Sequence, residues 1–146
     1  MSQFEFCQTI FYVQDVSATL DFYKRVFGFD TFFQDKDNRY GVLKTGHTMH
    51  DGKEVGMIGF SSADVVRDSM IKQDMHLAKK GQKPLGAEIC LMTPDIETAY
   101  AEVIAKGAEA VSPPEPKPWG ARVAYVRDLN GLLIELTTPM ESDSQI

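Results

Sequence analysis

The chain of 146 residues lacks the long apolar run that a membrane helix requires. No stretch approaches the roughly 20 apolar residues that span a bilayer, so we expect no membrane partner. The start, Met1-Ser2-Gln3-Phe4-Glu5, also lacks a basic segment followed by an apolar stretch, which is the pattern of a secretion signal. On this pattern we expect a cytoplasmic protein.

Basic residues are fewer than acidic ones. The chain has 15 Lys and Arg against 21 Asp and Glu, which gives a formal net charge of −6. A surface that binds phosphate backbones needs a basic stripe, and none is visible in the sequence. The sequence therefore argues against a nucleic-acid partner.

Cysteine and histidine are also scarce. The two cysteines, Cys7 and Cys90, form no Cys-x-x-Cys pair, so a structural zinc site has little support. In the cytoplasm both would stay reduced, and we interpret them as small buried hydrophobic residues. His47 and His50 have His-x-x-His spacing on an expected loop, where spacing fixes no geometry, and His76 lies in a charged linker. We interpret all three histidines as solvated.

The chain contains an internal repeat. Residues 8–16 align with residues 88–96, and each run reads as a strand that ends in an aspartate, Asp15 or Asp95. Aspartate is a good helix N-cap, because its carboxylate accepts hydrogen bonds from the first helical turn. We therefore expect a strand followed by a helix in each half of the chain.

Apolar residues then recur at three- and four-residue steps, which is typical of one buried helical face. They are Leu20, Tyr23, Val26 and Phe27 in the first copy and Ile96, Ala99, Tyr100, Val103 and Ile104 in the second. Gly28 and Gly107 follow these runs, and we expect each to end its helix in the left-handed conformation.

Strand patterns follow each glycine. Residues 39–44 align with residues 122–127, and residues 56–60 align with residues 132–136. The order strand, helix, strand, strand, strand thus occurs twice. It predicts an α+β fold of two tandem βαβββ modules, whose curved mixed sheets surround a cleft.

One domain should cover residues 1–146. We expect the first module at about 4–62, a linker with one helix at about 63–85 and the second module at about 86–139. Four prolines between positions 113 and 118 predict a stiff extended loop that ends at Trp119.

Several of these segments resemble the vicinal-oxygen-chelate superfamily, which includes glyoxalase, bleomycin-binding proteins and extradiol dioxygenases. The similar segments are residues 13–23, 26–29, 118–122 and 127–136, and the resemblance covers about 4–139. The resemblance implies a small-molecule ligand and a homodimer. It does not select a function, because one fold hosts many activities.

Metal-using members of that superfamily have four ligand positions, and by resemblance these fall on Gln8, Gly59, Glu88 and Glu135. Glu88 stands where histidine is usual, and Gly59 has no side chain. A set of Gln8, Glu88 and Glu135 offers only oxygen, which suits Mg²⁺ or Mn²⁺ better than Zn²⁺. The alternative is a ring of polar side chains in a wet cleft, so the cofactor is unknown, with a divalent metal as one possibility.

Glu88 and Glu135 are also the candidate catalytic residues. Two carboxylates close together in a partly dry cleft repel each other, which raises one pKa and suits acid–base chemistry. Cys90, two residues after Glu88, should point into the same cleft and contact a ligand. It lacks a nearby base in the sequence that would make it a nucleophile.

Three further residues are candidate ligand contacts. Trp119 offers a flat aromatic wall or merely packs its loop onto the sheet. Arg39 and Arg122 begin matching strands, where they would attract an anionic ligand at the cleft edge or remain solvated. The aromatic residues Phe11, Tyr12, Phe32 and Phe33 are interpreted as core or interface residues.

The sequence leaves two functions open. The first is a metal-free protein that binds an aromatic or peptide-like small molecule, which the missing ligand at Gly59 and the Trp119 loop favour. The second is a metal-dependent lyase or isomerase similar to glyoxalase, which Gln8 and Glu135 favour. A ring-cleaving dioxygenase fits least, because the histidines of its iron site are absent at the matching positions.

Overall fold

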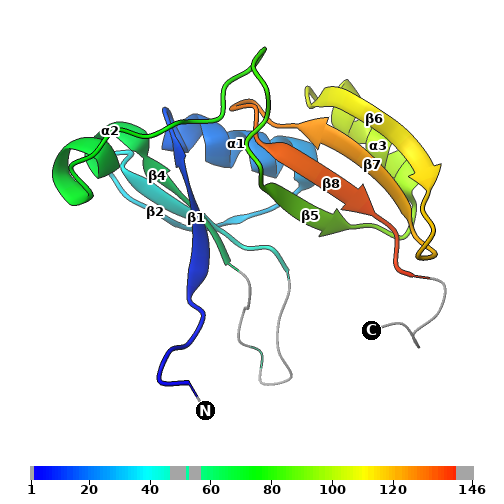
Figure 1. Ribbon diagram of the computed structural model, residues 1–146, viewed down its shortest axis with the longest axis horizontal. Helices are drawn as coiled ribbons and strands as arrows, with labels where there is room; N and C mark the ends of the chain where they lie inside the picture. Colours follow the sequence, from blue (N-terminus) through cyan, green and yellow to red (C-terminus); the bar gives the residue numbers. More distant parts are fainter. Residues whose placement is uncertain (1, 47–51, 53–56, 141–146) are drawn as a thin grey trace. The chain divides into compact units, whose positions relative to one another are not determined.

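The computed structural model describes residues 2–46, 52 and 57–140, and the chain divides into two compact units. Unit 1 is Met1–Leu77 and unit 2 is Ala78–Ile146. Each unit contains one sheet and one long helix, labelled in Figure 1. His47 and His50 lie outside the described residues, whereas His76 is exposed, in line with its interpretation as a surface residue.

Unit 1 begins with strand β1 (Gln8–Val13) and helix α1 (Val16–Phe27). Strands β2 (Thr31–Gln34), β3 (Tyr40–Leu43) and β4 (Met57–Ser62) follow. A single helical turn α2 (Ala63–Val65) continues into a short π-helix, η1 (Val66–Met70).

Unit 2 repeats the first five elements. They are strand β5 (Glu88–Met92), helix α3 (Ile96–Ala105), and strands β6 (Glu109–Pro116), β7 (Arg122–Arg127) and β8 (Leu133–Thr137).

The two sheets have the same topology. Their strand orders are β1-β4-β3-β2 and β5-β8-β7-β6, with the first pair of each sheet parallel and the other pairs antiparallel. Residue 8 pairs with 57 in unit 1, and the aligned residue 88 pairs with 133 in unit 2. The α+β fold of two repeated modules is thus confirmed. Both sheets are open, and the cleft expected between curved sheets stays a prediction.

The helix ends follow from the capping signals in the sequence. The Asp15 carboxylate accepts a hydrogen bond from the Ala18 amide at 3.0 Å, and Asp95 accepts one from the Thr98 amide at 3.2 Å. Gly28 ends α1 with φ of 76°, a conformation that costs a residue with a Cβ atom free energy. These local contacts fix where each helix begins and where α1 ends.

Each helix covers one face of its own sheet and leaves the other face uncovered by that helix. In unit 1 the Phe60 ring lies 5.2 Å from the ring of Tyr23 on α1 and 6.2 Å from the Phe11 ring. Because side chains alternate along a strand, Gln8 and Ile10 point away from α1. The core of unit 1 therefore lies between α1 and the sheet, and Gln8 and Ile10 lie on the opposite face of the sheet.

Two expectations were wrong. Residues 109–116 form edge strand β6 despite their prolines, because an edge strand tolerates residues without an amide donor. The two cysteines are exposed, since Cys90 lies on the face of β5 opposite to buried Ile89 and Cys7 precedes β1. Helical structure does occur within the linker region, where α2 and η1 directly follow β4 and belong to unit 1.

Candidate functional site

Unit 2 brings three predicted site residues together on the uncovered face of its sheet. Cys90 on β5 pairs with Glu135 on β8, and Glu88 lies two residues before Cys90 on the same face. Tyr125 on β7 pairs with Glu135 from the other side. Ile134, next to Glu135, is fully buried against the opposite face. We call Glu88, Cys90, Tyr125 and Glu135 the acidic face.

The environment of Glu135 favours its protonated form. Partial burial, together with hydrogen bonding and repulsion from Glu88, raises the pKa of Glu135 to about 7. A hydrogen bond from Tyr125 and the positive charge of Lys117 oppose this rise of the pKa. A carboxyl with a pKa near neutrality can donate and accept a proton under the same conditions, so the pair suits acid–base chemistry.

The same environment favours the neutral forms of Cys90 and Tyr125. Partial burial, followed by repulsion from Glu135 and Glu88, raises the pKa of the Cys90 thiol. The same causes raise the pKa of the Tyr125 phenol. A thiol needs a lowered pKa to act as a nucleophile, so Cys90 can contact a ligand but is poorly suited to attack one.

In unit 1 the positions that align with Glu88 and Glu135 are Gln8 and Gly59, and neither carries a charge. The Gln8 side chain and the Tyr40 hydroxyl are hydrogen-bonded, with Gln8 Nε2 at 2.5 Å and Gln8 Oε1 at 2.8 Å from the Tyr40 oxygen. A Cβ atom at Gly59 would lie 2.8 Å from Gln8 Oε1. The missing side chain at position 59 therefore leaves room for the Gln8–Tyr40 pair.

These donors do not fit the metal site that the resemblance implies. Unit 1 offers one amide already bonded to a phenol, and unit 2 offers the carboxyl of Glu135, whose pKa is raised by burial and by Glu88. Across the described residues no cluster of three or more His, Cys, Asp or Glu side chains is placed to hold a metal ion. The metal role of Gln8, Glu88 and Glu135 stays a prediction, and we derive no chemistry through a metal.

Two predicted ligand contacts lie elsewhere in unit 2. Arg122 forms an ion pair with Glu97 on α3, so its side chain is on the helix-covered side of the sheet and does not join the acidic face. Strand alternation gives this signal in the sequence, because Arg122 shares its parity with the buried residues Ala124 and Val126. Trp119 lies in the turn between β6 and β7 and is 50% exposed, and its role stays a prediction.

Unit 1 contains a pocket of about 360 Å³ on the sheet face that α1 leaves uncovered. Its apolar walls come from β1, β2 and the α2–η1 segment, through Ile10, Phe33, Val65, Val66 and Met70. Phe33, which we interpreted as a core or interface residue, thus lines a pocket.

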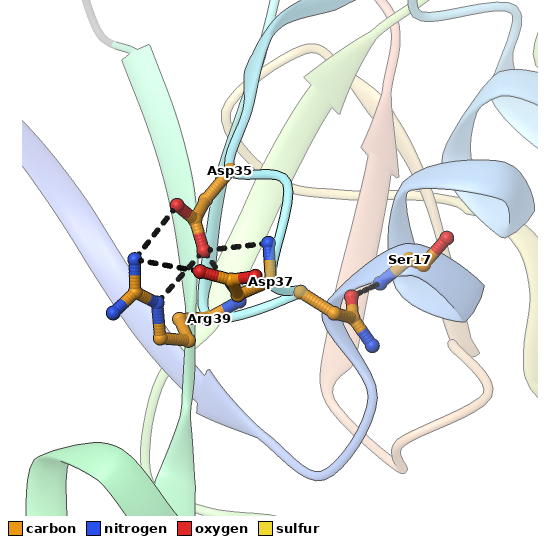
Figure 2. Close-up of polar contacts among 5 residues, drawn as sticks. Ser17, Asp35, Asp37 and Arg39 are labelled. Carbon is orange, nitrogen blue, oxygen red and sulfur yellow. Dashed lines mark hydrogen bonds and ion pairs between the residues drawn. The ribbon is translucent and has the colours of Figure 1, made fainter.

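The polar edge of this pocket is Asp35, Arg39, Tyr40 and Ser61. Arg39 donates to both carboxylate oxygens of Asp35, from Nε at 2.9 Å and from Nη2 at 3.1 Å. Its Nη2 is also 3.3 Å from an Asp37 carboxylate oxygen, as Figure 2 shows. Of the predicted ligand contacts, Arg39 is the one that lines this pocket.

Sequence reasoning missed the α2–η1 wall of the pocket. Val65, Val66 and Met70 stand out as apolar residues in a charged segment, but that segment has no counterpart in the second module. The Ile71 amide bonds to the Val66 carbonyl at 3.0 Å, which closes the wider turn of a π-helix. Such turns often occur at functional sites, although no sequence pattern identified this one.

Similarity to solved structures defines the class of fold. A glyoxalase/bleomycin resistance protein/dioxygenase from Nocardioides has a TM-score of 0.72 and 19% identity, over 97% of this chain and 87% of that one. A family enzyme from Burkholderia phytofirmans PsJN has a TM-score of 0.70 and 16% identity, over 90% and 95%. TioX from Micromonospora sp. ML1 has a TM-score of 0.64 and 24% identity, over 90% and 95%. At these identities the likeness shows the shared fold alone.

The sequence itself identifies the family. The family model of the Glyoxalase/Bleomycin resistance protein/Dioxygenase superfamily matches residues 6–136, nearly the whole chain. The chain belongs to this superfamily. A comparison with curated proteins found no match. Among the described helices, none is long and apolar enough to cross a membrane.

Proposed function

We propose that the protein binds a small organic molecule in the unit 1 pocket. The observation that carries this proposal is a cavity of about 360 Å³ with mostly apolar walls and a short polar edge. Ligand sites usually have this character, since apolar walls supply binding energy and a few polar groups orient the ligand. Exposed apolar side chains gather at this pocket, among them Met70 at 68% and Phe33 at 49%, which a ligand would cover.

A pocket-filling variant tests the proposal. Ser61 is half-buried on β4 and lines the pocket, so Ser61→Leu should reduce its volume. Ser112→Leu, at a half-buried serine of β6 in unit 2, is the matched control. A set of aromatic fragments is screened against both variants by saturation-transfer NMR. We expect fragments that bind wild type and Ser112→Leu but lose binding to Ser61→Leu. Fragments that bind all three proteins alike would contradict the proposal.

A second candidate function is proton transfer at the acidic face, as in a lyase or isomerase. It is supported by the raised pKa of Glu135 beside Glu88, which provides a group that exchanges protons near neutral pH. Here Glu135 would move the proton, and the hydrogen bond from the Tyr125 hydroxyl would stabilise its ionised form. Exchange of the protons next to the carbonyl of simple ketones for solvent deuterium, followed by NMR, is the relevant test. Exchange by wild type that Glu135→Gln lacks would favour this candidate, and equal exchange by both proteins would contradict it.

The assembly and location of the protein are also proposals. We propose a homodimer, since open sheet edges tend to be paired or covered, and a cytoplasmic location. Light scattering at micromolar concentration should give about twice the chain mass of 16.3 kDa. A mass of one chain at that concentration would contradict the dimer.

A further inference from the structure

The polar edge of the unit 1 pocket selects the charge of the ligand, an inference that rests on the proposed function. Asp35 and Arg39 are the charged residues that line the pocket in the described part of unit 1. The sequence alone suggests that Arg39 attracts an anion. However, Arg39 already contacts two carboxylates, Asp35 at 2.9 Å and Asp37 at 3.3 Å. An incoming anion would have to displace one of them and would meet the other at close range.

A second charged cluster, outside the pocket lining, repeats this arrangement. On the α2–η1 wall, Arg67 lies 3.2 Å from Asp64 and 2.8 Å from Asp68. Again two carboxylates surround one guanidinium, so the positive charge is more than compensated locally. Lys36 lies in the β2–β3 turn and Lys72 lies just after η1. Both lysines are exposed, and neither lines the pocket. The field at the pocket edge therefore disfavours an anion.

Asp35 is suited to receive a cation. Its side chain is only 18% exposed, which reduces screening by water, whereas the Arg39 side chain is 54% exposed. The Arg39 guanidinium lowers the pKa of Asp35 to about 2, so the carboxylate stays ionised at neutral pH. Within the described part of the chain, Asp35 Oδ1 accepts one hydrogen bond, from Arg39 Nη2 at 3.1 Å. A carboxylate oxygen accepts two, so capacity remains for a donor in the pocket.

Aromatic rings line the pocket beside this carboxylate. The rings of Phe33 and Tyr40 lie 6.0 Å apart at an angle of 44°, and both residues belong to the lining. The face of an aromatic ring attracts a cation, and the effect grows where water is excluded. The aromatic rings of Phe33 and Tyr40 and the Asp35 carboxylate together favour a ligand with an organic ammonium group.

We propose that the unit 1 pocket binds an aromatic amine in its ammonium form. The apolar ring system lies against Ile10, Val66 and Met70, and the ammonium group donates a hydrogen bond to Asp35.

Three probes of equal size test this charge selection. They are naphthylmethylammonium, naphthylmethanol and naphthoate, which share a ring system and carry a positive, a neutral and a negative group. Binding is followed through the NMR methyl signals of Ile10, Val66 and Met70. We expect the cation to bind about tenfold more tightly than the alcohol and the anion to bind most weakly.

Variants then locate the charge that discriminates. Asp35→Asn keeps one acceptor oxygen for the backbone amides of the turn and should reduce the preference for the cation over the alcohol to about one. Asp21→Asn, at an exposed aspartate of α1 on the covered side of the sheet, should retain the preference. Because Asp35 also shapes the β2–β3 turn, the wild-type ranking of the three probes stands as a test without the variant.

The outcomes separate the two proposals. Alcohol or anion binding at these methyl groups as tightly as the cation would overturn the charge selection and leave the pocket intact. A cation preference that persists in folded Asp35→Asn would overturn the role of Asp35. If none of the three probes moves the methyl signals, both the pocket and its charge selection fail.

Discussion

Glu135→Gln should change how the stability of the protein depends on pH. In the folded chain burial and Glu88 raise the pKa of Glu135 from 4.5 to about 7. Between these two values the folded state holds a proton that the unfolded state releases. The stabilising contribution is therefore fully present below about pH 4.5 and is lost as the pH rises through about 7. Glutamine does not titrate, so the variant should lack this loss.

The magnitude follows from the pKa and from exposure. Without screening, the rise of the Glu135 pKa would correspond to about 3 kcal/mol between the protonated and ionised forms. Glu135 is only half-buried, so water screens much of this energy, and we expect about 1 kcal/mol. Wild type should thus lose about 1 kcal/mol of unfolding free energy between about pH 4.5 and about pH 8 relative to Glu135→Gln. The fold itself should remain intact, because the side chain lies outside the core.

Urea denaturation of both proteins at the two pH values measures this difference. Glu109→Gln, at an exposed glutamate of β6, is the matched control and should keep the wild-type dependence. Glu88→Gln should lower the pKa of Glu135, since one source of repulsion is lost. Equal pH dependence in wild type and Glu135→Gln would refute the assignment of the raised pKa to Glu135. Unfolding of the variant at all pH values would instead identify Glu135 as a structural residue.

Three predictions concern the fold that positions these sites. Arg127 is 7% exposed and donates hydrogen bonds to the carbonyls of Lys79, Gln82 and Gly131. Arg127→Met should therefore lower the free energy of unfolding by about 3 kcal/mol. A loss below about 1 kcal/mol in urea denaturation would contradict this role. Gly28→Ala forces a residue with a Cβ atom into the left-handed conformation and should lower the free energy of unfolding by about 1 kcal/mol. Gly86 has open space and no positive φ, so Gly86→Ala should leave stability nearly unchanged. Equal thermal midpoints of the two variants would refute the strain at Gly28. Asp15→Ala removes the N-cap of α1 and a hydrogen bond from Asn38. It should lower the free energy of unfolding by about 1 kcal/mol, measured by thermal unfolding. An unchanged thermal midpoint would show that water replaces the cap.

Much of the fold was predictable because its signals are local. Asp15 and Asp95 cap their helices through contacts three residues away, and Gly28 ends α1 through its own backbone conformation. Alternation along one strand places Glu135 on the face opposite to buried Ile134. Each of these inferences needs only a short segment of sequence.

The pocket was not predictable because it depends on packing between distant segments. Val66 and Met70 meet Ile10 only after α2 and η1 fold back from β4, and their sequence resembles a linker. Arg39 lines the pocket as expected, but its pairing with Asp35 depends on the conformation of the turn between β2 and β3. Because Asp35 pairs with Arg39, the arginine presents less positive charge to a ligand, and the sequence alone does not reveal this pairing.

The central claim is that the unit 1 pocket holds a small molecule, and contacts measured in the complex test it most directly. Intermolecular NOEs are recorded between the ring protons of naphthylmethylammonium and the methyl groups of the protein. We predict NOEs to Ile10 and Val66, which line the pocket from β1 and η1. NOEs confined to methyl groups of unit 2, such as those of Leu133 beside the acidic face, would contradict the account.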